Sequence, residues 1–156
     1  MRNDSRLSRM LHVLLHMARH EGTLTSEQIA TMLSTNPVVV RRTMAGLREA
    51  GYVRSEKGHG GGWSLACALT DITLLDIHRA VGGPRVFAIG PESDNPACAV
   101  EKVVNAALED ALHEAETLLV NRLGAIPLSE LLVKFDTLCQ GASVHADQHT
   151  RCTKAS

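Results

Sequence analysis

The sequence predicts a mainly α-helical fold with one small β-hairpin, and three observations lead to that class. Two amphipathic segments between residues 25 and 51 carry helix-start and helix-stop residues and are separated by a short turn. Two segments of alternating polarity then flank a glycine-rich stretch, which is typical of a β-hairpin. Residues 99–123 repeat apolar side chains at three- and four-residue spacing, which predicts one long helix.

Residues 5–20 are expected to form the first helix and to pack under the unit that follows. Its predicted apolar face consists of Leu7, Met10, Leu11, Leu14, Leu15 and Ala18. His12 and His16 have the four-residue spacing of helical metal ligands. Because no acidic or cysteine partner stands near them in the sequence, we interpret them as surface or half-buried histidines and predict no metal site.

A second helix is predicted to begin after Thr25, whose side chain can cap it while Gln28 reaches back to the same residue. Further along, Ile29, Met32 and Leu33 share one face. This helix must end before Pro37, because a residue that precedes proline avoids the α conformation.

A third helix is predicted from Asn36, as the cap, and Pro37, as the first helical residue, to a stop at Gly51. We expect Val38, Met44 and Leu47 to face the core. The remaining positions include the three arginines of the segment, Arg41, Arg42 and Arg48.

The hairpin is predicted from residues 52–55 and 63–66, with a flexible tip at 56–62 that holds Lys57 and His59. Such a wing can place backbone N–H groups and cations against phosphates or in a minor groove.

Helix, turn, arginine-bearing helix and glycine-tipped hairpin, in this order, predict a winged helix-turn-helix domain that binds double-stranded DNA. A helical hairpin followed by an ordinary solvated loop is the alternative without that function. The residues predicted to contact DNA are Thr35, Asn36, Pro37, Val38, Arg41, Arg42, Arg48, Lys57, His59, Gly60 and Gly61.

A fourth helix is predicted from Thr73, which Asp76 can help to cap, to Gly82-Gly83. The long helix at 99–123 has an apolar stripe wide enough to bury one surface against its own domain and another against a partner. It therefore predicts a homodimer, with packing inside one chain as the alternative. The predicted dimer residues are Val100, Val104, Leu108, Ala111, Leu112 and Leu119.

The predicted organisation is a winged helix-turn-helix domain at 1–83, a linker or sensor loop at 84–97, a dimerisation helix with a short C-terminal helix at 98–136, and a disordered tail at 137–156. The short helix is expected to run over residues 127–135.

The amino-acid composition is consistent with an aliphatic core and with a DNA-binding N-terminal half. Hydrophobic residues make up 44% of the chain and aromatic residues only 3%, so aliphatic side chains must fill the core. Residues 1–60 hold nine Lys and Arg against five Asp and Glu, whereas residues 61–156 hold seven against twelve, so the positive charge coincides with the proposed DNA-binding half. With no signal peptide or membrane-spanning stretch visible, we expect a cytoplasmic protein without a membrane partner.

Four segments also carry a family resemblance: TNPVVVRRTMAGLREAGYVRS, GHGGGWSLA, ITLLDIHRAVGG and NPACAVEKVVN. They resemble the Rrf2 family of winged-helix transcription regulators, and within it the YwnA-like branch, over residues 5–136. In cluster-binding members, three loop cysteines and a further ligand hold an iron–sulfur centre. Here Cys98 alone matches, because the usual spacing falls on Glu92 and Val86. The resemblance therefore implies a homodimeric regulator without an iron–sulfur cofactor.

Cys98 stands at the start of the long helix, where the backbone dipole and N–H groups favour a thiolate. We predict that it senses redox or electrophile stress at the junction of the DNA-binding domain and the dimer helix; an inert buried thiol is the alternative. The function predicted is a dimeric repressor of a dyad-symmetric operator. The alternatives are control by a protein partner or small molecule, or an iron–sulfur regulator. A thiol enzyme is disfavoured because no CxxC or nucleophile–base pattern occurs.

Overall fold

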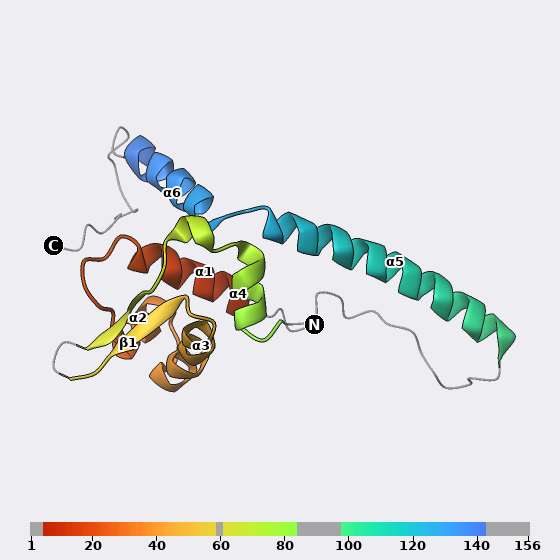
Figure 1. The fold of residues 1–156 in the computed structure, drawn as a ribbon, viewed down its shortest axis with the longest axis horizontal. Coiled ribbons are helices and arrows are strands. Elements are labelled where there is room, and N and C mark those ends of the chain that lie inside the picture. Colours follow the sequence, from red (N-terminus) through yellow and green to blue (C-terminus); the bar gives the residue numbers. More distant parts are fainter. Residues whose placement is uncertain (1–4, 59–60, 84–97, 143–156) are drawn as a thin grey trace.

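The computed structural model describes residues 5–58, 61–83 and 98–142 of the 156-residue chain, and these residues form a mainly helical fold with one two-stranded sheet (Figure 1). In chain order the elements are α1 (Arg6–Met17), α2 (Ser26–Met32), α3 (Pro37–Glu49), β1 (Val53–Glu56), β2 (Gly62–Leu65), the 3-10 helix η1 (Leu69–Asp71), α4 (Leu74–Ala80), α5 (Ala99–Gly124) and α6 (Leu128–Ala142). The predicted fold class, a winged helix-turn-helix domain followed by a long helix, is confirmed.

One aliphatic core joins α1, α2, α3, α4, η1 and the first turn of α6. Its largest fully buried side chains are Val13, Leu14, Ile29, Val40, Met44, Leu47, Ile72, Ile77 and Leu128. Most of the predicted α1 face packs on this core, although the sequence analysis missed Val13, which is completely buried. The low aromatic content is accommodated as expected, because aliphatic side chains fill the interior and Trp63 closes its edge at 8% exposure.

The boundaries of the helix-turn-helix follow from local chemistry. Thr25 caps α2 through a complete capping box with Gln28. Asn36 caps α3 by accepting a 2.8 Å hydrogen bond from the Val38 backbone N–H, and Pro37 is the first helical residue. Gly51 ends the helix in a left-handed conformation with φ of 83°.

The inward face of α3 differs from the prediction at one position. Val38 was expected to face the core, but it is 64% exposed, while Val40 is 1% exposed and takes that place. Val40, Met44 and Leu47 are spaced by four and three residues and so lie on one side of a helix; Val38 is six residues from Met44 and points elsewhere. The correction leaves Val38 available on the outer surface of α3.

The wing is attached to α2 through Trp63. β1 and β2 pair antiparallel, with Val53 opposite Leu65 and Glu56 opposite Gly62. Trp63 also exchanges two backbone hydrogen bonds with Leu24, at 2.9 and 2.8 Å, and its indole N–H donates to Ser26 Oγ at 3.0 Å. These contacts fix the base of the wing relative to the first turn of α2.

Helix α4 connects the winged helix-turn-helix to the long helix. Thr73 and Asp76 form the predicted capping box, and Gly82 has the predicted left-handed conformation beyond the helix. On one side α4 approaches α3 so closely that a Cβ at Gly46 would lie 2.5 Å from the Ala80 carbonyl oxygen. On the other side the Leu74 N–H donates to the Ile126 carbonyl at 3.0 Å.

Helix α5 projects away from the rest of the molecule and touches it through its C-terminal end (Figure 1). The expectation that one face of this helix would be buried against its own domain is wrong, since none of its residues is buried. The segment that follows α5 is attached by the hydrogen bond from the Leu74 N–H to the Ile126 carbonyl and by the Leu128 N–H, which donates to the Ile72 carbonyl at 2.8 Å.

Helix α6 returns to α1 and is longer than predicted. The short helix expected over 127–135 continues to Ala142, so residues 137–142 are not part of a disordered tail. No proline interrupts this stretch, and Phe135 and Asp136 anchor it on α1 through His16 and an ion pair with Arg19. The remainder of the predicted tail, 143–156, and the loop at 84–97 lie outside the described residues. Within the described chain, no helix combines the length and apolar character needed to cross a membrane.

Candidate nucleic-acid interface

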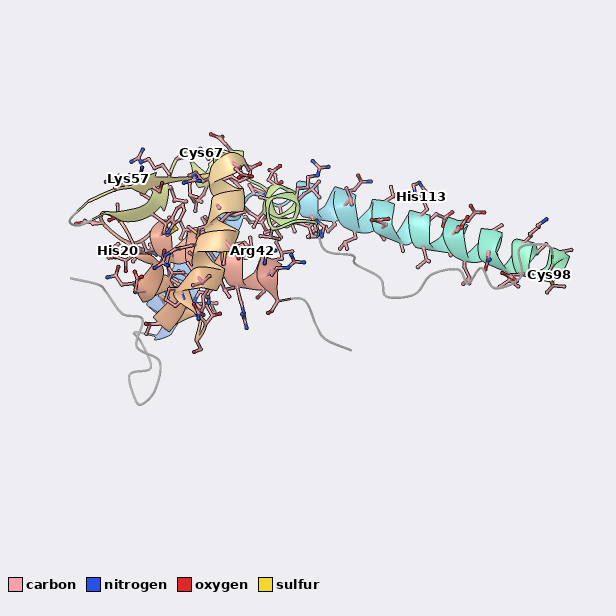
Figure 2. The ribbon with its side chains drawn as sticks, turned by 90° about the horizontal axis from the view of Figure 1, so that it is seen from below. His20, Arg42, Lys57, Cys67, Cys98 and His113 are labelled. Atoms are coloured by element: carbon pink, nitrogen blue, oxygen red, sulfur yellow. The ribbon has the colours of Figure 1, made fainter. Side chains whose placement is uncertain are left out.

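The outer surface of α3 carries three exposed arginines, Arg41, Arg42 and Arg48. On the same helix Arg42 lies opposite the core residues Val40, Met44 and Leu47, whereas Arg41 and Arg48 lie on the flank of that core face. Figure 2 shows Arg42 on α3 and Lys57 on the neighbouring wing. The predicted DNA-contact residues of α3 and the described part of the wing are therefore brought onto one part of the molecule.

The N-terminal turn of α3 adds an apolar part to this surface. Thr35, Asn36 and Pro37 form the turn that leads into the helix, and Val38 and Val39 follow it at 64% and 50% exposure. Val39 is not among the residues predicted to contact DNA. Its two branched methyl groups stand in solvent beside the arginines, although folding alone would favour burying them.

The wing places a lysine close to glycines with constrained conformations. Lys57 is exposed and is followed by Gly58, whose φ is 100°. The Gly61 N–H donates to the Gly58 carbonyl at 3.0 Å, in a turn that leaves no room for a Cβ at Gly61. His59 and Gly60, also predicted to contact DNA, lie outside the described residues.

Arg48 connects α3 with the wing. Its guanidinium donates a 3.5 Å hydrogen bond to Ser55 Oγ on β1, so the last turn of α3 touches the wing. Arg54, which the sequence analysis did not single out, is exposed on the same strand and donates to Ser64 Oγ at 3.0 Å. Because neighbouring strand residues point to opposite faces, Arg54 and Ser55 lie on different faces of the hairpin, and the Glu56 carboxylate lies 3.8 Å from Arg54. The link between α3 and the wing therefore comes from Arg48.

Arg41 is held by a residue that the sequence analysis did not consider. Glu27, in the first turn of α2, accepts a 2.6 Å charged hydrogen bond from the Arg41 guanidinium. The pKa of the Glu27 carboxyl lies below its ordinary value, first because its own backbone N–H donates to it and then because of Arg41. Glu27 and Arg41 are fourteen residues apart, so no local sequence motif predicts this ion pair.

Cys98 is remote from this surface. It is the N-terminal flanking residue of α5, half-buried, with a free thiol and no side-chain cap hydrogen bond. Figure 2 shows it at the tip of α5 that is far from the DNA-binding domain, roughly 39 Å along a 26-residue helix from the end that meets α4. The expected place at the junction with its own domain is therefore wrong, because α4 packs on the C-terminal end of α5.

The other described free thiol, Cys67, follows β2. Burial, and then the neighbouring Asp71 carboxylate, raise the pKa of Cys67, which makes it the less reactive kind of thiol.

The predicted dimer residues all lie on α5, and most are open to solvent. Val100, Val104 and Leu108 are 71%, 50% and 37% exposed. Ala111 is exposed, while Leu112 and Leu119 are half-buried. Val103 and Leu118, at 71% and 73% exposure, extend the apolar surface beyond the predicted set.

The free cysteines that the structure describes do not come together as ligands for an iron–sulfur cluster. Such clusters are held mainly by cysteine thiolates, and in the segment 84–98 the sequence offers Cys98 alone. Cys67 lies on the compact domain, whereas Cys98 lies at the far tip of α5 (Figure 2). Within residues 5–58, 61–83 and 98–142, no three His, Cys, Asp or Glu side chains gather closely enough to hold a metal ion.

Comparison with known proteins agrees with this architecture. The family model Rrf2, described as an iron-dependent transcriptional regulator, matches residues 3–134. YwnA of Bacillus subtilis (strain 168), named as an HTH-type transcriptional regulator, is 34% identical over 129 residues that cover 83% of this chain and 96% of YwnA.

Two solved structures show the same fold. IscR of T. potens has a TM-score of 0.62 at 20% identity, over 96% of this chain and 94% of IscR. CymR (YrzC), the global cysteine regulator of B. subtilis, has a TM-score of 0.56 at 24% identity, over 86% of this chain and 98% of CymR. The matched family and YwnA are regulators of transcription and not enzymes. With its winged helix-turn-helix and its long helix α5, the chain belongs to the Rrf2 family of transcriptional regulators.

Proposed function

We propose that this regulator is a cytoplasmic homodimer that represses transcription by binding a dyad-symmetric operator, and that Cys98 links its DNA affinity to oxidants or electrophiles. The observation that supports DNA binding most strongly is the exposure of three arginines on α3, with Arg42 opposite the core face and Arg41 and Arg48 on its flank. Exposed arginines add no stability to the folded domain, but they can bind the phosphates of a polyanion such as DNA.

Helix α3 suits the major groove in size and in chemistry. The groove admits one α-helix, and an arginine in it can donate two hydrogen bonds to guanine O6 and N7. The exposed methyl groups of Val38 and Val39 fit thymine methyl groups, which are the apolar feature of the same groove. The turn residues Thr35 and Asn36 stand where the helix would approach the phosphates.

The wing supplies contacts beside those of α3. Lys57 and the backbone N–H groups of its glycine tip suit phosphates or a minor groove, and neither requires a particular base. Because Trp63 ties the hairpin to Ser26 and Leu24, the wing and α3 would meet the duplex with a fixed spacing.

Helix α5 supports the dimer. An apolar stripe that includes Val100, Val104 and Leu118 stands in solvent along a helix of 26 residues. A second copy of the same helix covers such a stripe under two-fold symmetry, which is the commonest symmetry of soluble oligomers. Two winged domains related in this way would contact two half-sites of a palindromic operator.

The position of Cys98 determines how a thiol signal would act. Since the residue lies at the tip of α5, its modification would change the pairing of α5 with its partner helix, and through that pairing the separation of the two α3 helices. The route predicted from the sequence, through the junction with its own domain, is not available.

Selection of duplexes from a random library, followed by titration of variants, tests the DNA-binding proposal. Arg41→Ala and Arg42→Ala should each weaken binding to the selected duplex by about 5- to 150-fold, which corresponds to roughly 1–3 kcal/mol. A phosphate-binding arginine should in addition flatten the salt dependence for every sequence. Lys102→Ala, on the exposed surface of α5, serves as the control. Unchanged affinity of both arginine variants would exclude α3 from the interface.

We also propose that the regulator works without an iron–sulfur cluster, although the family is described as iron-dependent. The single cysteine at 84–98 supports this proposal. Protein purified without oxygen should be colourless and contain no stoichiometric iron or inorganic sulfide. One cluster per chain, measured by both analyses, would contradict the proposal and require ligands from other parts of the chain.

A further inference from the structure

The ion pair between Glu27 and Arg41 connects the two helices of the helix-turn-helix at the surface proposed to meet DNA. The Arg41 Nη2 lies 2.6 Å from Glu27 Oε1, and both side chains are more than half exposed, at 55% and 64%. An exposed pair of this kind adds little to folding stability, because water and salt screen it. Because the pair lies beside the exposed valines of α3, it can affect how this surface recognises DNA.

Glu27 extends from a well-fixed backbone. Thr25 caps α2 through a capping box with Gln28, and Glu27 lies between these two residues. The Glu27 carbonyl accepts a 3.0 Å hydrogen bond from the Thr31 hydroxyl one turn later. The carboxylate that binds Arg41 is therefore attached to the ordered first turn of α2.

This contact uses one part of the Arg41 guanidinium and leaves the rest available. A guanidinium has five N–H donors in a planar fork, and Glu27 takes a donor on Nη2. The other donors can still form the paired hydrogen bonds that identify a guanine edge. The adjacent Arg42 differs, because within the described residues it has no ion pair or side-chain hydrogen bond that restrains it.

We propose that Glu27 is a positioning residue that orients Arg41 for contact with a base edge and so contributes to operator specificity, whereas the unrestrained Arg42 binds the phosphate backbone. This proposal rests on the DNA-binding function proposed above. Holding a long side chain in its binding conformation before the encounter lowers the entropy lost on binding, and it lowers that loss only for the sequence that matches the held geometry.

The direction in which Glu27→Gln changes DNA affinity distinguishes a positioning role from simple charge repulsion. A carboxylate close to DNA repels phosphates, so simple electrostatics predicts that Glu27→Gln strengthens binding to every duplex, including a scrambled one. A positioning role predicts the opposite for the selected operator. The two explanations therefore differ in direction and not only in size.

The experiment measures binding of full-length Glu27→Gln to the duplex selected by the parent protein and to a scrambled duplex of the same composition. The ratio of the two dissociation constants should fall by about fivefold, with weaker binding to the selected duplex and equal or slightly tighter binding to the scrambled one. Single-base substitutions across the half-site should show that the lost preference is concentrated at the position that Arg41→Ala also relaxes.

Two further variants complete the test. In an Arg41→Ala background, Glu27→Gln should have no additional effect on the ratio, because the side chain that it positions is gone. Glu49→Gln removes the same charge at the last residue of α3, roughly 12 Å along the helix from Arg41, and should leave the ratio unchanged. Thermal melts followed by the fluorescence of Trp63, the single tryptophan, should confirm that each variant is folded.

Failure of this inference is distinguishable from failure of the proposed function. If the parent protein selects no preferred duplex, the proposed function is wrong and the inference falls with it. If the parent selects one and Glu27→Gln binds both duplexes more tightly, or lowers the ratio equally when Arg41 is absent, the positioning role is wrong and the DNA-binding proposal stands.

Discussion

The winged domain and α5 contain similar apolar residues, but the domain buries them and α5 exposes them. In the domain, apolar side chains such as Val13, Ile29 and Met44 are completely buried by neighbouring elements of the same chain. In α5, Val100, Val103 and Leu118 are more than 70% exposed, and no residue of the helix is buried. The same hydrophobic effect that explains the first region leaves the second unexplained within one chain.

The difference shows what each region needs to be stable. Isolated helices are marginal in water, and valines add little intrinsic helix propensity. A 26-residue helix without a buried residue in one chain would gain burial in the homodimer proposed above. The core of the winged domain is complete within one chain, whereas under that proposal the stability of α5 depends on association.

The largest expected effect comes from a charge within the exposed stripe of α5. Val104→Glu should raise the dimer dissociation constant at least 100-fold, about 3 kcal/mol, because an unpaired carboxylate would be buried between the helices. Operator binding should weaken with it, since two half-sites can no longer be bound together. Sedimentation equilibrium at micromolar concentration measures the first effect and duplex titration the second.

Ala106→Glu is the matched control, because it adds the same charge two residues further on, nearly opposite on the helix. It should leave the dimer intact. The more exposed Val104 is a cleaner site than the predicted Leu112 or Leu119, which are half-buried in the single chain. A monomeric parent protein at micromolar concentration would contradict the dimer.

The comparison also separates what the sequence predicts from what it cannot. Capping at Thr25, Asn36 and Thr73, and the stop at Gly51, were predictable because each depends on residues within a few positions. The same applies to the long helix, whose predicted start and end agree with the structure to within one residue. Local chemistry and strong periodicity were sufficient for these features.

One local feature was misassigned although the sequence contains it: Val40, Met44 and Leu47 share a helix face by their spacing, and Val38 does not. Features that depend on distant packing were missed for a different reason. The contact of Glu27 with Arg41 depends on the angle between two helices, and the remoteness of Cys98 depends on which end of α5 meets α4. Neither of these two relations leaves a signal within one stretch of sequence.

A smaller effect is expected from the thiol at the tip of α5. Cys98 should react with iodoacetamide before Cys67, whose pKa is raised by burial and by Asp71. Mass spectrometry of partly alkylated protein gives the order. Oxidation by hypochlorite should then change operator affinity about tenfold, equivalent to roughly 1.4 kcal/mol, through the pairing of α5.

Cys98→Ser should bind DNA like the parent protein and lose this response, whereas Cys67→Ser should retain it. Alkylation of Cys67 first, or an undiminished response in Cys98→Ser, would show that the thiol switch is wrong. A ligand or a protein partner would then be the better explanation of regulation.

Helix α6 packs on α1 and the residues just after it, and ionisable groups take part in this contact. The rings of His12 and His16 lie 4.7 Å apart, and His16 is also 6.3 Å from Phe135 of α6. Arg19 pairs with Asp136 and lies over the Phe135 ring, 5.8 Å from its centre. The pKa of His16 is lowered from 6.5, first by burial and then by the charge of His12.

The smallest expected effect is a pH dependence of stability that originates at His16. Because its pKa is lower in the folded chain than in the unfolded chain, the unfolded chain binds more protons just below pH 6.5, and the free energy of unfolding should rise with pH there. The contribution is present above pH 6.5 and is lost as the pH falls toward the folded pKa. Since His16 is only half-buried, solvent screening should keep it below about 1 kcal/mol. Urea unfolding monitored by Trp63 fluorescence between pH 5 and pH 7.5 measures it, and the slope should flatten in His16→Asn but persist in His113→Asn, on exposed α5. An equal slope in the parent and in His16→Asn would assign the pH dependence to other groups.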